Sequence, residues 1–193
     1  AADYDLATLG NHEFDYGMDK FLDLANNKAS FKYLSCNFIS LGDNKPVFDG
    51  YSIKEINGVK VAFVGVSTPE TFTKSTPTFF QDKDGNYIYS FCQGNNGQDL
   101  YDAVQDTVDE VQAAGADYVI AIAHLGIDEQ SSPWMSREVI KNTSGIDVLI
   151  DGHSHSTIAE EKVQNASGKD VLLSSTGTKL KNIGKLTIDG EGN

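Results

Sequence analysis

Every histidine in this 193-residue chain stands at or shortly after the end of a short, mainly apolar run. The runs occupy residues 5–9, 118–123 and 146–150, and the histidines that follow them are His12, His124, His153 and His155. Apolar runs of this length are typical of strands buried on both faces of a parallel sheet. The carboxyl ends of such strands lie along one edge, where α/β proteins bind their ligands. We therefore expect an α/β fold that brings four imidazoles together.

The segments between these runs have the periodicity of helices and further strands. Residues 18–25 and 100–111 carry apolar side chains at the i, i+3, i+4, i+7 spacing of one helix face. Residues 133–141 predict another helix, with proline in its first turn. Residues 51–66 predict a hairpin that turns at Asn57-Gly58. Three further strands are expected near the end of the chain, at residues 162–163, 171–173 and 185–188. This order indicates α/β layers with mixed sheets.

The composition excludes some classes of partner. The net charge of −13 argues against nucleic acid, because the chain has no excess of basic groups to displace counterions from phosphates. No stretch approaches the roughly 20 apolar residues of a membrane-spanning helix. The two cysteines, Cys36 and Cys92, lack the spacing of a metal site, and the sequence leaves open whether they pair.

The first histidine lies in a loop that is dense in reactive groups. Asn11, His12, Glu13 and Asp15 place an amide, an imidazole and two carboxylates within five positions, between a strand and a helix. Such groups hold metals or move protons. A polar turn that caps the helix is the alternative, but the other histidines favour a metal site. Imidazole with amide or carboxylate oxygen suits zinc, manganese, iron or nickel. Residues 67–70, Ser-Thr-Pro-Glu, end another apolar run, and we interpret them as a plain turn. The alternative is that their hydroxyl groups contact the substrate or water near it.

Three segments resemble motifs of the calcineurin-like metallophosphoesterases. They are residues 10–15 (Gly-Asn-His-Glu-Phe-Asp), residues 123–126 (Ala-His-Leu-Gly) and residues 151–155 (Asp-Gly-His-Ser-His). The continuation from Phe14 to Gly17 is similar to the branch of 5'-nucleotidases and 2',3'-cyclic nucleotide phosphodiesterases. The resemblance implies a four-layer α/β/β/α sandwich. It also implies metal-dependent hydrolysis of nucleotide phosphate esters, with two divalent ions, zinc or manganese, in the full-length protein.

The resemblance also implies a role for each matching residue. The implied metal ligands are Asn11, His124 and His153 for the second metal and His155 for the first. His12 corresponds to the catalytic histidine at the phosphate and the leaving oxygen, and Asp15 to the carboxylate that orients it. This pairing makes chemical sense, because a catalytic imidazole needs a partner that fixes its tautomer. We expect Glu13 to act at the helix N-terminus rather than as a metal ligand.

The chain departs from the family pattern at its beginning. The family also has an Asp-x-His and a Gly-Asp motif upstream of the Asn-His-Glu motif, and neither is among the ten residues before Asn11. We therefore expect residues 1–193 to be a single partial catalytic domain that lacks its first strands. We also expect the C-terminal domain that selects the nucleotide in this branch to be absent. Such a chain would bind at most one metal and would be an impaired hydrolase.

Other interpretations stay open at this point. A non-catalytic metal-binding or interaction module would explain the missing aspartates. Sister branches with the same metal site act on other phosphate or sulfur esters. From the resemblance we expect an exported protein, located outside the cell, in the cell wall or in the periplasm. A sheet that lacks strands exposes an edge, so we also expect some self-association.

Overall fold

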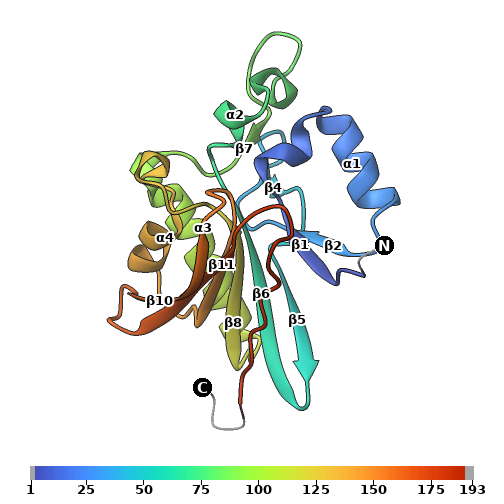
Figure 1. Cartoon of the computed structure of the whole chain (residues 1–193). Coiled ribbons are helices and arrows are strands. Elements are labelled where there is room, and N and C mark those ends of the chain that lie inside the picture. Colours follow the sequence, from blue (N-terminus) through green and yellow to red (C-terminus); the bar gives the residue numbers. More distant parts are fainter. Residues whose placement is uncertain (1–2, 190–193) are drawn as a thin grey trace.

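A six-stranded mixed sheet forms the larger part of the fold. The structure, a computed structural model, describes residues 3–189 (Figure 1). The sheet has the order β10-β11-β9-β8-β6-β5. Its strands are β5 (Tyr51–Ile56), β6 (Val59–Ser67), β8 (Tyr118–His124), β9 (Val148–Asp151), β10 (Thr157–Gln164) and β11 (Asp170–Thr176). β6, β8, β9 and β11 run parallel, and β5 and β10 are antiparallel to their neighbours. Ser67 lies opposite His124, so β6 and β8 end at the same edge.

Helices cover one face of this sheet. α3 (Gln98–Ala113) and α4 (Ser136–Asn142) pack their apolar residues against β6, β8 and β9 in the largest hydrophobic cluster (Figure 1). Each fully buried aliphatic side chain of this kind contributes about 1.5–3 kcal/mol by leaving water. The stripe expected at residues 100–111 is therefore confirmed as the buried face of α3. The expected helix at 133–141 begins later, at Ser136. The residues before it form the turn η4 (Glu129–Ser131) and the loop that connects this turn to the helix.

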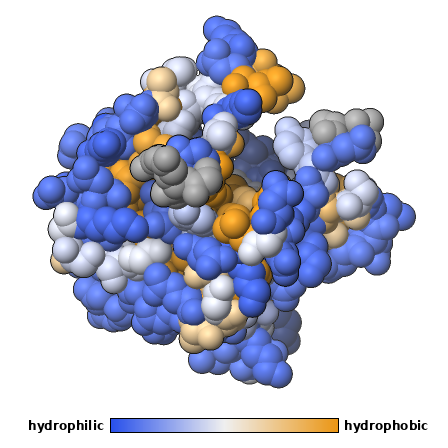
Figure 2. Space-filling view, turned by 90° about the horizontal axis from the view of Figure 1, so that it is seen from below, coloured by the Kyte–Doolittle hydropathy of each residue, from blue (hydrophilic) through white to orange (hydrophobic). Residues whose placement is uncertain are grey.

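The other face of the sheet is apolar as well. Val61, Ile120 and Val148 form a separate hydrophobic cluster there. Leu186 and Ile188 line a cavity of about 600 Å³ together with residues of β6 and β8. Hydrophobic residues gather around the middle of the molecule when it is viewed from below (Figure 2). The strand expected at 185–188 is therefore wrong: this segment lies against the sheet through its side chains and pairs with no strand among the described residues.

The N-terminal part forms a smaller unit around an aromatic cluster. It contains two small sheets, one of β1 and β2 in parallel and one with the order β4-β3-β7. Its strands are β1 (Leu6–Thr8), β2 (Lys32–Leu34), β3 (Ile39–Ser40), β4 (Lys45–Pro46) and β7 (Tyr89–Ser90). Its helices and turns are η1 (Asn11–Phe14), α1 (Met18–Asn27), α2 (Thr71–Lys74) and η2 (Pro77–Phe80), with η3 (Asn95–Gly97) leading into α3. Phe14 is fully buried at the centre of this cluster.

One close backbone approach joins the two parts. Gly65 in β6 lies against Leu34 of β2, and a Cβ atom built on Gly65 would come within 2.2 Å of the Leu34 carbonyl oxygen. The Cys36 amide donates to the Gly65 carbonyl at 2.9 Å, and the Gly65 amide donates to the Gly50 carbonyl at 3.0 Å. Only glycine leaves room for this packing. The contact therefore sets the position of the loop after β1 relative to the edge of the large sheet.

Candidate active site

The loop after β1 is held rigidly before α1. Gly10 is extended, and its amide donates to Glu13 Oε2 at 2.7 Å, which closes a capping arrangement around η1. Burial raises the pKa of the Glu13 carboxyl. Phe14 anchors the turn through edge-on contacts with Phe21 and Phe80, each with ring centroids 5.0 Å apart. Glu13 therefore acts within its own turn, as the sequence predicts.

His12 and Asp15 form a pair at the rim of the site. His12 Nδ1 lies 2.8 Å from Asp15 Oδ2, and the His12 side chain is 74% exposed. A carboxylate accepts hydrogen bonds only, so this contact places the imidazole proton on Nδ1. Nε2 then keeps its lone pair. His12 thus has the tautomer and the exposure of a group that exchanges protons with a bound molecule.

Asn11, His124 and His153 converge on one point, and we call them the ligand trio. Asn11 Oδ1 lies 3.1 Å from His124 Nε2 and 3.1 Å from His153 Nδ1, and the two nitrogens are 3.2 Å apart. Zinc holds nitrogen and oxygen ligands at about 2.0–2.1 Å, so neighbouring ligand atoms are separated by roughly 3.0–3.4 Å. The ligand trio therefore has the spacing of three atoms that share one metal.

The trio contains two imidazoles and one amide. Within residues 3–189, no group of three or more His, Cys, Asp or Glu side chains is arranged to hold a metal. The donor set thus depends on Asn11, which is 5% exposed and positioned by η1. Burial, reinforced by the neighbouring histidines, lowers the pKa of His124 to about 4. His124 is therefore neutral near pH 7, which is the form that binds metals.

A buried carboxylate holds the two histidine loops together. Asp151, the last residue of β9, accepts hydrogen bonds from the amides of Leu125 at 3.0 Å and Gly126 at 3.2 Å. It also accepts one from the Ser136 hydroxyl at the start of α4. Burial raises the pKa of Asp151, although these donors oppose the shift. Asp151 therefore fixes the loop after β8 relative to the loop after β9, and with it His124 relative to His153.

Glu70 belongs to the site, although its sequence context indicates a plain turn. Glu70 Oε2 lies 3.0 Å from His153 Nε2, and the Ser131 hydroxyl donates to the same oxygen at 2.6 Å. The interpretation of residues 67–70 as a plain turn is therefore wrong for Glu70. One feature of the sequence does point to a role in the site: Glu70 follows β6, and β6 ends at the same edge of the sheet as β8. The direction of its side chain is set by α2, a single turn without strong periodicity.

All four histidines line one cavity of about 290 Å³. Its remaining lining residues are Asn11, Glu70, Lys74, Asp128, Gln130 and Ser131. His155 contributes from the loop after β9, where it has a positive φ of 57°. Among the described residues, no hydrogen bond joins His155 to the ligand trio. The four imidazoles thus share one cavity, as expected. The expectation of a single sheet is wrong for the first strand, because β1 pairs with β2 in a separate sheet from β8 and β9. The individual roles of these residues stay predictions.

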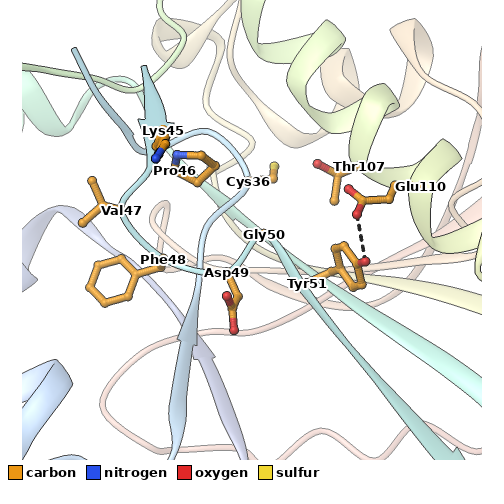
Figure 3. A pocket seen from close by; sticks show the side chains of 10 residues that line it. All are labelled: Cys36, Lys45, Pro46, Val47, Phe48, Asp49, Gly50, Tyr51, Thr107 and Glu110. Carbon is orange, nitrogen blue, oxygen red and sulfur yellow. Dashed lines mark hydrogen bonds between the residues drawn. The ribbon is translucent and has the colours of Figure 1, made fainter. Parts of the chain in front are cut away.

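A larger cavity lies away from the histidines. It has a volume of about 650 Å³ and lies between residues 45–51 and α3 (Figure 3). Tyr51 donates a hydrogen bond to Glu110 at 2.9 Å across it (Figure 3). Burial raises the pKa of the Cys36 thiol in its wall to about 12, so this thiol stays protonated and unreactive. Cys36 and Cys92 are both free. The Cys36 thiol is therefore no candidate nucleophile in this cavity.

Comparisons with known proteins agree with the fold and the motifs. Residues 1–173 match the family described as bacterial capsule synthesis protein PGA_cap. The chain is 32% identical over 167 residues to the trifunctional nucleotide phosphoesterase protein YfkN of Bacillus subtilis, covering 80% of this chain and 10% of that protein. It is 31% identical over 160 residues to a 5'-nucleotidase of Diplobatis ommata, covering 81% of this chain and 24% of that protein.

A solved structure shows the same architecture. The calcineurin-like phosphoesterase YfkN from Bacillus subtilis superposes with a TM-score of 0.66 at 29% identity, covering 90% of this chain and 55% of that chain. The α/β fold class expected from the sequence is thereby confirmed. The chain spans about a tenth to a quarter of the length of the curated relatives that it matches first. No helix among residues 3–189 has the length and apolar character needed to cross a membrane.

Proposed function

Because the chain belongs to the PGA_cap family and has the fold of the calcineurin-like phosphoesterases, we propose that it forms part of the catalytic domain of a nucleotide phosphoesterase. The proposed reaction is metal-dependent hydrolysis of a phosphate ester of a nucleotide, by a 5'-nucleotidase or a 2',3'-cyclic nucleotide phosphodiesterase. The single observation that carries the proposal is the ligand trio, which shares one cavity with the His12–Asp15 pair.

The residues present fit a divalent metal. Asn11 offers an amide oxygen, and His124 and His153 offer imidazole nitrogens, a donor set that suits zinc or manganese. A bound metal would polarise phosphoryl oxygens and lower the pKa of bound water. Two metals belong to the proposed full-length enzyme. Within this chain the resemblance leaves only His155 for the first metal, so we expect at most one bound ion and impaired hydrolysis from the chain alone.

His12 supplies the proton transfer in this proposal. With Asp15 holding its Nδ1 proton, Nε2 can take up a proton from water, and the resulting imidazolium can donate that proton to the leaving oxygen. Asp15 stabilises the imidazolium that results when His12 holds a second proton. The cavity is otherwise poor in cations, because Lys74 is the only lysine or arginine among the described residues that line it. The positive charge that balances the phosphate is therefore expected from bound metal rather than from side chains of the protein.

Two further points follow the same reasoning. Export of the full-length protein is supported by relatives such as the venom 5'-nucleotidase of Crotalus adamanteus. The alternative function, a non-catalytic metal-binding or interaction module, would use the ligand trio but would not need His12. Loss of hydrolysis on changing His12 alone therefore separates the two functions.

The test is His12→Ala in a full-length protein that contains this chain, loaded with Mn²⁺. We expect release of inorganic phosphate from 5'-AMP, or opening of 2',3'-cyclic AMP to adenosine monophosphate, to fall by about a hundredfold or more, because general acid–base groups usually contribute that much. Lys20→Ala, at an exposed position of α1, is the matched control and should leave the rate unchanged. A rate within twofold of wild type for His12→Ala would show that the assigned role is wrong.

A further inference from the structure

The carboxylate of Glu70 is directed into the site by a tightly hydrogen-bonded turn. Its amide donates to Thr68 Oγ1 at 3.1 Å, and its carbonyl accepts from the amide of Lys74 at 2.7 Å. Glu70 stands at the N-cap of α2, yet its side chain makes no capping hydrogen bond to that helix. The residue is 8% exposed. A buried carboxylate that is unused by its own helix must find partners elsewhere.

The close partners of the Glu70 carboxylate are residues of other elements that line the same cavity. Oε2 contacts His153 Nε2 at 3.0 Å and accepts from Ser131 Oγ at 2.6 Å, while Oε1 lies 4.0 Å from Lys74 Nζ. Lys74 is about half exposed, and an ion pair of this length and exposure contributes little to stability. The close contacts of Glu70 are therefore those with His153 and Ser131. Three elements, α2, η4 and the loop after β9, meet at this one carboxylate.

The contact decides which nitrogen of His153 carries the proton. A carboxylate accepts hydrogen bonds only, so a neutral His153 that is bonded to Glu70 carries its proton on Nε2. Nδ1 then keeps its lone pair, and Nδ1 is the atom that lies 3.1 Å from Asn11 Oδ1 and 3.2 Å from His124 Nε2. His153 also has a positive φ of 75°, which is unusual for a histidine and needs support from its surroundings. Glu70 supplies such support.

We propose that Glu70 is a positioning residue that locks His153 in the Nε2–H tautomer, so that Nδ1 presents its lone pair to a metal held with Asn11 and His124. This inference rests on the proposed metal site and extends it. Carboxylates that orient a ligating histidine are widespread, and their loss typically weakens metal binding 10- to 100-fold. Glu70 itself is no ligand in this arrangement, because it contacts Nε2 of His153, whereas the atom directed at Asn11 and His124 is Nδ1 on the other side of the ring. Ser131 holds Oε2 of Glu70 in place.

The first measurement uses the metal-free 193-residue chain with ¹⁵N-labelled histidine at pH 8. Long-range ¹H–¹⁵N correlation spectra distinguish the two neutral tautomers, and His153→Gln assigns the signal. In the wild type we expect the Nε2–H pattern for His153, with a proton protected from exchange. In Glu70→Leu, Nε2 has no acceptor, and Asn11 favours a proton on Nδ1. We therefore expect the protected proton to disappear and the pattern to shift toward Nδ1–H.

The second measurement is the affinity for Zn²⁺, by competition with a chromogenic chelator. We expect Glu70→Leu to bind at least tenfold more weakly than wild type. Glu70→Gln should bind more tightly than Glu70→Leu and keep the Nε2–H pattern, because its amide oxygen still accepts a hydrogen bond. Ser131→Ala should weaken binding less than Glu70→Leu. Circular dichroism checks that each variant folds. If Glu70→Leu does not fold, Glu70→Ala takes its place with the same expectations, because alanine also offers Nε2 no acceptor.

The outcomes separate this inference from the proposed function. A weaker affinity in Glu70→Leu together with the tautomer shift supports the positioning role. A protected Nε2–H proton that survives in Glu70→Leu, or an affinity of Glu70→Leu for Zn²⁺ within twofold of wild type, overturns it. If the wild type itself binds no Zn²⁺, the metal site of the proposed function fails, while the tautomer measurement still decides whether Glu70 sets the state of His153.

Discussion

At the scale of single residues, His124 shows how burial keeps an imidazole in its neutral form. Its pKa lies at about 4 in the folded chain, first because burial disfavours the charged ring and then because His153, His12 and His155 lie nearby. An unfolded histidine has a pKa of about 6.5. The folded chain therefore keeps a lone pair on His124 across the whole physiological range of pH. A protonated His124 could not share a metal with Asn11 and His153.

This shift predicts a loss of stability in mild acid. Between pH 6.5 and 4 the unfolded chain binds more protons at His124 than the folded chain does, so the free energy of unfolding falls as the pH falls. Above pH 6.5 and below pH 4 this group has no further effect. In chelator-treated chain, urea unfolding should show a loss of about 3 kcal/mol across this window that His124→Gln lacks. Parallel pH curves for the two proteins would contradict the buried, neutral state.

Residues of the site differ in how far their sequence context predicts them. The histidines, Asn11 and Asp15 are predictable, because each follows an apolar strand that ends at the site, although β1 lies in a separate sheet from β8 and β9. Glu70 follows such a strand too, but Ser-Thr-Pro-Glu is equally typical of a turn. Its role depends on the direction of one side chain, and that direction comes from packing around α2. The role of Asp151 cannot be predicted from the sequence for a similar reason, because its partners are backbone amides of another loop.

At the scale of elements, the position of the loop after β1 depends on how β6 packs against β2. The hairpin expected at residues 51–66 is confirmed as β5 and β6, and β6 lies inside the large sheet between β5 and β8. Its contact with β2 through Gly65 is not readable from the sequence, since a glycine within an apolar run is equally typical of a bulge. Helix α3 is predictable because its stripe is long, whereas the start of α4 and the segment 185–188 are set by tertiary packing.

The Gly65 contact predicts a large effect from one methyl group. In Gly65→Ala the added Cβ would meet the Leu34 carbonyl at 2.2 Å, so β6 and β2 must move apart. We expect the free energy of unfolding to fall by about 3 kcal/mol, in the upper part of the usual range for overpacking. Gly42→Ala is the matched control, because its added Cβ would lie 4.0 Å from the nearest atom, Ser40 Oγ. Equal urea midpoints for the two variants would contradict this packing.

At the scale of the whole molecule, strands of the two-stranded and the six-stranded sheet lead to one cavity. Residues more than a hundred positions apart, such as Asn11 and His124, meet because β1 and β8 both lead toward the same cavity. The order of elements along the sequence predicts the α/β layers to which these strands belong. The distances within the ligand trio are beyond sequence reasoning, since they depend on the packing of Phe14 and on the loops held by Asp151. Self-association through a sheet edge stays a prediction.

The central claim is that Asn11, His124 and His153 assemble a metal site in this chain, and bound-metal stoichiometry tests it most directly. The chain is dialysed against trace Zn²⁺ and Mn²⁺ and its metal content is measured by elemental analysis. We predict about one metal per chain for the wild type and a large loss in the double variant His124→Gln, His153→Gln. Essentially no metal in the wild-type chain, or equal metal in the double variant, would contradict the claim.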